Sequence, residues 1–306
     1  MKRAVVVVVW ILAISVYTFG FGGHEAQAQQ GLTKIADGVY SYIDEKNPTP
    51  DKSFGANSGI IIGRDGIVVV DTRISSKEAQ RFIKDIKAVS DKPIKYVVNT
   101  HYHLDHALGN GDFIKLGATV IAQMNCKKNI RDNAGTVLLR AKNYGLTDEM
   151  MQGTKPAEPS MTFDSRMEID LGDRKVALIN TGASHTDDSI VVYVPDAKVL
   201  FAGDILFTNF HPNMRDGDIA SWVKALDSIM AMDVAAIIPG HGPLSTKKDI
   251  QDMKQYLITF DRIGRDLSAQ GKDVKYIAAE ILKAVPKREF FEMFVAGNVS
   301  EKYLEK

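Results

Sequence analysis

Residues 100–106 read Thr-His-Tyr-His-Leu-Asp-His, which places three histidines and one aspartate in a single short segment. Side chains alternate in an extended backbone, so His101, His103 and Asp105 point to one side and His106 points elsewhere. Several neutral imidazoles lie close together at little cost when a cation binds them and fixes their tautomers. The heptapeptide therefore predicts a metal site, and one loop of this kind can serve two adjacent ions.

Three further candidate ligands follow later in the chain, each close to glycine. His185 lies in TGASH, Asp204 in AGD and His241 in PGHG. Glycine lets the backbone pass close to a site. A carboxylate such as Asp204 can also bridge two cations and offset charge that neutral imidazoles cannot. The four segments together predict one metal centre assembled from distant parts of the chain.

The remaining sequence predicts a single α/β domain. Runs rich in β-branched residues, bounded by turn residues, predict strands at 38–42, 58–62, 67–71, 94–99, 167–171, 175–180, 189–194, 198–202 and 235–239. Capping residues and helical periodicity predict helices at 76–89, with Ser76 as the candidate N-cap, and at 220–232, 246–269 and 274–284. The segment 125–161 separates the strands predicted up to residue 99 from those predicted from residue 167 onward, and an insertion at this point can form a lid or a pocket wall.

Composition excludes some classes of function. The chain has 306 residues, of which 45% are hydrophobic, and 38 lysines and arginines balance 38 aspartates and glutamates. This balance gives no long-range field that would attract nucleic acid, so a nucleic-acid partner is not expected. Cys126 is the single cysteine, so an intramolecular disulfide is ruled out. Stability must come from the core and from any bound metal.

The first 28 residues have the pattern of a secretory signal peptide. Lys2 and Arg3 precede an apolar run over residues 4–19, and Ala26-Gln27-Ala28 offers small residues for cleavage after Ala28. We therefore expect a signal peptide at 1–28, a mature domain at 29–306, and a periplasmic or secreted protein without stable membrane association after cleavage. An uncleaved N-terminal anchor is the alternative.

The motifs THYHLDH, TGASH, AGD and PGHG, in this order, resemble those of the metallo-β-lactamase superfamily, and of its glyoxalase II-like metallo-hydrolase branch. The resemblance runs from about residue 32 to 256 and implies a four-layer αββα sandwich. It implies one metal on His101, His103 and His185, a second on Asp105, His106 and His241, and Asp204 as the bridge. Two zinc ions are the expected cofactors, with iron or manganese as alternatives.

A further carboxylate, Asp71, resembles the one that lies beneath the histidine loop in this family and orients a ligating imidazole. Capping of a strand end is the alternative role for Asp71. His211, which follows Asp204 in a loop, is a weak candidate for substrate binding, and an exposed loop histidine is the alternative.

The resemblance also implies a reaction, in which a metal-bound hydroxide cleaves a small ester, lactone, thioester or amide. Asp105 is the candidate catalytic residue, and its roles as metal ligand and as base are not separable from the sequence. Lactamases of the superfamily resemble this chain less, because they carry cysteine or serine where it has Asp204. Antibiotic β-lactam hydrolysis and iron-dependent persulfide dioxygenation are the alternatives, and a noncatalytic metal-binding protein is a third. The expected partner is a small molecule, and the oligomeric state stays open.

Overall fold

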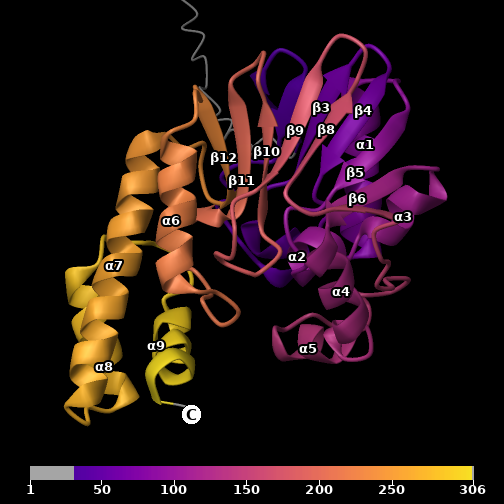
Figure 1. Ribbon diagram of the computed structural model, residues 1–306. Coiled ribbons are helices and arrows are strands. Elements are labelled where there is room, and N and C mark those ends of the chain that lie inside the picture. Colours follow the sequence, from indigo (N-terminus) through magenta and orange to yellow (C-terminus); the bar gives the residue numbers. More distant parts are fainter. Residues whose placement is uncertain (1–30, 305–306) are drawn as a thin grey trace, which may run out of the picture. The chain divides into compact units, whose positions relative to one another are not determined.

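Two β-sheets stack face to face in residues 31–304, the part of the chain that the computed structural model describes (Figure 1). The first sheet has seven strands in the order of the sequence: β1 (Thr33–Ala36), β2 (Val39–Ser41), β3 (Gly59–Gly63), β4 (Gly66–Val70), β5 (Ile94–Val98), β6 (Thr119–Gln123) and β7 (Met161–Phe163). The second sheet has the order β12-β11-β10-β9-β8, with β8 (Arg166–Asp170), β9 (Lys175–Asn180), β10 (Ile190–Val194), β11 (Val199–Phe207) and β12 (Ala236–His241).

Apolar side chains fill the space between the sheets because the central strands are apolar on both faces. Val68 and Val98 of the first sheet pack against Val192 and Phe201 of the second. The alternate residues of the same strands point outward and are covered by helices.

Helices cover the outer face of each sheet. On the first sheet, α1 (Ser76–Val89) and α3 (Asn110–Lys115) pack over the strands, whereas α6 (Ile219–Met230) and α7 (Lys247–Ala269) cover the second (Figure 1). The four-layer αββα architecture expected from the sequence is therefore confirmed. The other helices are α2 (Leu104–Ala107), α4 (Met124–Asn133), α5 (Val137–Asn143), α8 (Val274–Ala284), α9 (Met293–Val299), the 3₁₀ helix η1 (Pro50–Gly55) and the π-helical turn η2 (Ser300–Leu304).

Some local expectations need correction. The N-cap of α1 is Ser75 and not Ser76, because Ser75 has an extended backbone and its side chain accepts a hydrogen bond from the backbone N–H of Glu78. The prediction did not include strands β1, β6 and β7 or helices α2, α3, α4, α5 and α9. Strands β1 and β7 have four residues or fewer, and neighbouring strands rather than local sequence determine such short pairings.

Among residues 31–304, no helix combines the length and the apolar character needed to cross a membrane. The expected signal peptide, with its cleavage position after Ala28, lies outside the described residues.

Candidate metal centre

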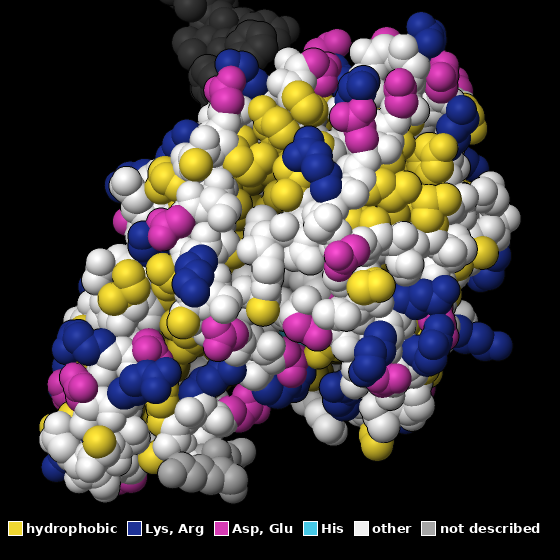
Figure 2. All heavy atoms as spheres, in the orientation of Figure 1, with side chains coloured by type: hydrophobic (Ala, Val, Ile, Leu, Met, Phe, Trp, Pro, Cys, Tyr) yellow, Lys and Arg dark blue, Asp and Glu magenta, His cyan; other side chains and the backbone are white. Residues whose placement is uncertain are grey.

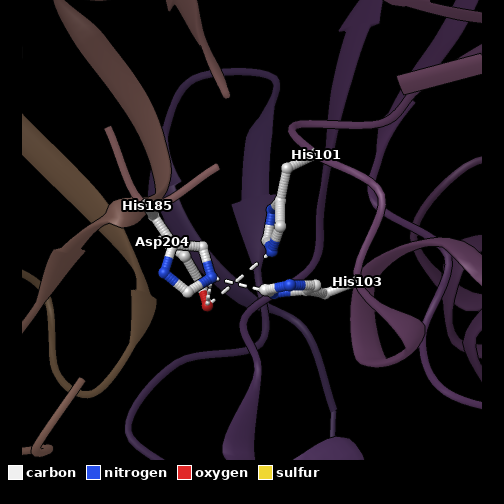
Figure 3. A group of neighbouring side chains, drawn as sticks. All are labelled: His101, His103, His185 and Asp204. Atoms are coloured by element: carbon white, nitrogen blue, oxygen red, sulfur yellow. Dashed lines mark hydrogen bonds and ion pairs between the residues drawn. The ribbon is translucent and has the colours of Figure 1, made fainter. Parts of the chain in front are cut away.

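Four of the predicted ligands form one group in which each residue offers an atom within 4.8 Å of the others (Figure 3). His101 and His103 follow β5, His185 lies in the turn between β9 and β10, and Asp204 lies within β11. The Oδ2 atom of Asp204 is 3.3 Å from Nε2 of His185 and 3.8 Å from Nε2 of His101. Two sheets therefore contribute to the same group.

Asp105, His106 and His241 form a second group by the same distance measure. Nε2 of His241 lies 3.4 Å from Oδ2 of Asp105. Asp204 also faces this group, with Oδ1 at 3.1 Å from Nε2 of His106 and Oδ2 at 3.5 Å from Nε2 of His241. The structure thus brings together all seven predicted ligands, and the carboxylate of Asp204 lies between the two groups.

Several polar atoms at the centre of these groups are buried without a hydrogen-bond partner. They are Nε2 of His101, Nε2 of His106 and Oδ1 of Asp204. The last two lie close to each other, but they are not aligned for a hydrogen bond. A buried polar atom without a partner costs free energy, and a ligand bound among these atoms would remove that cost. An imidazole and carboxylate donor set around such atoms fits divalent cations.

The electrostatics of the two groups agree with this fit. Burial lowers the pKa of His101 well below its usual value and lowers that of His185 to about 3, so both rings are neutral at neutral pH, as metal ligands must be. Burial opposes protonation of His106 too, but the carboxylates of Asp204, Asp105 and Asp71 outweigh it and raise the pKa of His106. The cluster therefore attracts positive charge.

Asp71 orients one of these rings from beneath. Its Oδ2 atom lies 2.8 Å from Nδ1 of His106, and its two oxygens accept hydrogen bonds from the backbone N–H and the hydroxyl of Thr100 at 2.7 and 2.8 Å. The residue is 1% exposed and has a left-handed backbone with φ of 60°. Asp71 therefore holds both the ring of His106 and the start of the histidine loop.

Asp216, which was not predicted from the sequence, contacts another ring of the centre. Its Oδ2 atom lies 2.9 Å from Nε2 of His103 and accepts a hydrogen bond from the Tyr102 hydroxyl at 2.9 Å. Arg215 donates to both oxygens of the same carboxylate, at 3.2 and 3.1 Å. This leaves Nδ1 of His103 directed at His185, 2.9 Å from its Nε2. In the sequence, Asp216 is an acidic residue next to a glycine in a loop. This pattern is too common to identify a residue that contacts a metal ligand.

We expect Asp216→Asn to lower metal affinity about 10-fold or more, because outer carboxylates of this kind fix the ring and raise its basicity. Competition with a chromophoric chelator measures the affinity. Asp218→Asn is the control, since Asp218 lies in the same loop but caps α6 through the backbone N–H of Ser221. Equal affinities of the Asp216 variant and the unchanged protein would contradict a role for Asp216 in holding His103.

The structure corrects the expectation for His211. The residue is 2% exposed, its Nδ1 lies 2.9 Å from the hydroxyl of Tyr256 in α7, and it is absent from the residues that line the cavity described below. Packing of α7 against the second sheet covers the loop that carries His211. It therefore faces the core and not a substrate.

A cavity of about 420 Å³ opens onto the cluster. His103, Asp105, His185, Asp204 and His241 lie at its base. The rest of the lining is largely apolar and includes Phe54, Leu104, Ile130, Val137, Phe207, Phe291, Met293 and Phe294. The segment 125–161 contributes part of this wall through α4 and α5, and residues at the start of α9 contribute on another side.

Known proteins resemble this chain in sequence and fold. Residues 52–241 match the family described as the metallo-beta-lactamase superfamily. A linear primary-alkylsulfatase from Pseudomonas sp. is 27% identical over 222 residues, which cover 62% of this chain and 42% of that protein. A metallo-beta-lactamase type 2 from Bacteroides fragilis is 24% identical over 229 residues, covering 73% of this chain and 84% of that protein. The chain thus spans less than half of the alkylsulfatase and most of the lactamase.

A solved structure shares the fold. The stereoselective inverting sec-alkylsulfatase from Pseudomonas sp. superposes with a TM-score of 0.69 at 19% identity, covering 90% of this chain and 50% of that chain. At this level of identity the superposition supports the architecture alone.

Proposed function

The chain belongs to the metallo-beta-lactamase superfamily and is a metal-dependent hydrolase. We propose that it cleaves a small ester, lactone, thioester or amide. The observation that carries the proposal is the position of Asp204, whose carboxylate faces both groups of ligands at the base of the cavity. One ion would be held by His101, His103 and His185, and the other by Asp105, His106 and His241. Asp204 would contact both ions. We propose zinc for both ions.

Two divalent ions held by these residues would supply Lewis acidity for activating water and polarising the substrate. Asp105 lines the cavity, and its side chain is 13% exposed. Its carboxylate is therefore positioned to accept a proton from the attacking water as well as to bind an ion. Asp71 keeps the ring of His106 in place while this happens.

Hydrolysis of β-lactams is a second candidate, which the similarity to the Bacteroides fragilis enzyme favours. The aspartate at position 204, where lactamases of the superfamily carry cysteine or serine, favours the other hydrolases. The relation to an alkylsulfatase makes a sulfate ester a further substrate to test. Iron-dependent persulfide dioxygenation, which is not a hydrolysis, is the remaining candidate.

Metal analysis and a substrate panel separate these candidates. The protein purified from its native compartment is analysed for metal content and then assayed with carboxylic esters, lactones, thioesters, amides, a β-lactam, an alkyl sulfate and a persulfide. Two zinc ions per chain with turnover of a carboxylic ester, lactone, thioester or amide support the proposal. A single iron ion with oxygen consumption on the persulfide would overturn it.

We also propose that the protein is exported and acts on a small molecule. The basic and apolar pattern of residues 1–28 and the small residues before Gln29 support export. Sequencing the N-terminus of the protein from the periplasm or the medium tests it, with Gln29 as the expected first residue. Recovery of the intact chain from the cytoplasm alone would contradict export.

A further inference from the structure

One cationic side chain in the cavity wall has no acidic partner. Arg140 of α5 lines the cavity. Within residues 31–304 its side chain donates one hydrogen bond, from Nη2 to the neutral amide oxygen of Asn133 at 2.7 Å. Its Nε atom is buried without a hydrogen-bond partner. Within residues 31–304, no carboxylate lies within ion-pair distance of Arg140. A guanidinium in this state can still bind an oxyanion through a planar pair of donors.

The other arginine of the wall is already neutralised. Arg215 lines the same cavity, but both oxygens of Asp216 accept from it, and its Nη1 donates to the hydroxyl of Tyr144 at 3.2 Å. Arg215 is therefore committed to the residues that hold His103. Arg140 is the cation of this wall that remains available to an incoming molecule.

Charge over α4 and α5 favours an anion as well. Residues 124–143 contain five basic side chains and one acidic side chain, although the whole chain is balanced. The basic members are Lys127, Lys128, Arg131, Arg140 and Lys142. Figure 2 shows Lys and Arg side chains gathered over this part of the surface, beside the cavity-lining helices. Three of these side chains, Lys128, Arg131 and Lys142, pair with carboxylates. Among the described residues, Lys127 and Arg140 therefore carry the positive charge that is left to attract an anion near the entrance.

Apart from the ligands and a few polar side chains, the wall of the cavity is apolar. Phe54 packs edge-on against both Tyr144 and Phe291, with ring centroids 6.2 Å apart in each pair. Val137 and Ile130 complete the wall on the side of α4 and α5. A molecule that fills this space therefore needs an apolar body, because the lining offers it few hydrogen bonds.

We propose that the substrate is an amphiphile whose apolar body lies along this wall and whose terminal oxyanion binds Arg140, with the scissile bond at the metal centre. The inference rests on the proposed function, because it places the scissile bond at that centre. The proposed substrate class is a small hydrolysable molecule that ends in a carboxylate or a comparable oxyanion. Arg140 is thereby assigned as a residue that determines specificity.

Binding of paired ligands tests this assignment independently of turnover. The zinc-loaded protein is titrated calorimetrically with linear dicarboxylates from hexanedioate to dodecanedioate and with the monocarboxylates of the same lengths. One carboxylate of each ligand can bind at the metal centre, and only the dicarboxylates carry a second for Arg140. We expect the best dicarboxylate to bind about 10- to 100-fold more tightly than its monocarboxylate, the range of a charge-assisted hydrogen-bonded pair.

Variants then identify the residue responsible. Arg140→Met should abolish the preference for the dicarboxylate, and Arg140→Lys should retain part of it. Arg131→Met is the matched control, since Arg131 lies on α4, pairs with Glu158 at 2.7 Å and does not line the cavity. The preference should survive in this control.

No preference at any length, or a preference that persists in Arg140→Met, would overturn the assignment even if the protein hydrolyses esters. Conversely, an Arg140-dependent preference in a protein that hydrolyses no member of the substrate panel would leave the anion site standing and reject the proposed function. The two ideas therefore fail separately.

Discussion

Replacing Asp204 with asparagine should lower turnover by about 1,000-fold or more and should reduce the metal content of the purified protein. The amide keeps the size of the side chain but removes the charge that lies between the two ligand groups. It also leaves Nε2 of His101 and of His106 buried beside a neutral group. The stabilisation supplied by a pair of metal ions amounts to several kcal/mol, which corresponds to this loss of rate.

Elemental analysis of the variant and steady-state rates measured on the same preparation check this expectation. Asp187→Asn is the matched control. Asp187 lies two residues from His185, is exposed, and accepts hydrogen bonds from Asn125 and Asn129 at the surface. Its variant should keep full metal content and rate. An Asp204 variant with two ions and unchanged turnover would remove Asp204 from the proposed centre.

The ligand positions could be predicted from the sequence because each lies in a recognisable local pattern. Most of them follow or end a strand, whereas Asp204 lies inside β11, which continues to Phe207 and so runs beyond the strand predicted at 198–202. The heptapeptide after β5 and the glycine-flanked segments around His185, Asp204 and His241 lie together at one end of the two sheets. Such residues approach one another for a simple reason, since strand ends of stacked sheets share an edge. The central strands could also be predicted from the sequence, because their apolar runs are long enough to identify.

The residues that hold the ligands in place were harder to predict from the sequence. Asp216 reaches His103 from a loop, and no periodicity determines where a loop carboxylate points. For His241 the partner of Nδ1 is the backbone oxygen of Phe54, 3.1 Å away. Every residue has a backbone oxygen, so the residue types in the sequence do not indicate which one contacts His241. His211 was misjudged for a related reason, since its burial depends on the packing of Tyr256 from a helix far along the chain.

Gly240 leaves no room for a larger side chain beside the carboxylate of Asp204. A Cβ atom at this position would collide with Oδ1 of Asp204 and would lie 2.7 Å from the carbonyl carbon of Gly203 and 2.8 Å from the backbone nitrogen of Asp204. Two of these contacts involve backbone atoms of β11, which cannot swing aside as the end of a flexible side chain can. The glycine in PGHG therefore makes room for the carboxylate between the two ligand groups.

We expect Gly240→Ala to lower turnover about 100-fold and to weaken metal binding, because the methyl group displaces the carboxylate of Asp204 while every ligand is still present. Displacing backbone as well should cost about 1–3 kcal/mol of folding free energy, as in other overpacked sites. Denaturant unfolding, chelator competition and turnover measured on one preparation separate the two effects. Because the carboxylate itself remains, excess zinc should restore part of the activity in Gly240→Ala and none in Asp204→Asn.

Gly135→Ala is the control for this experiment. A Cβ atom there would meet nothing within 4 Å, so stability, metal affinity and turnover should all stay unchanged. If Gly240→Ala also kept its metal affinity and its rate, Asp204 would have to be free to move without consequence. That result would reject the requirement for a fixed carboxylate between the two ions, on which the proposed dinuclear centre depends.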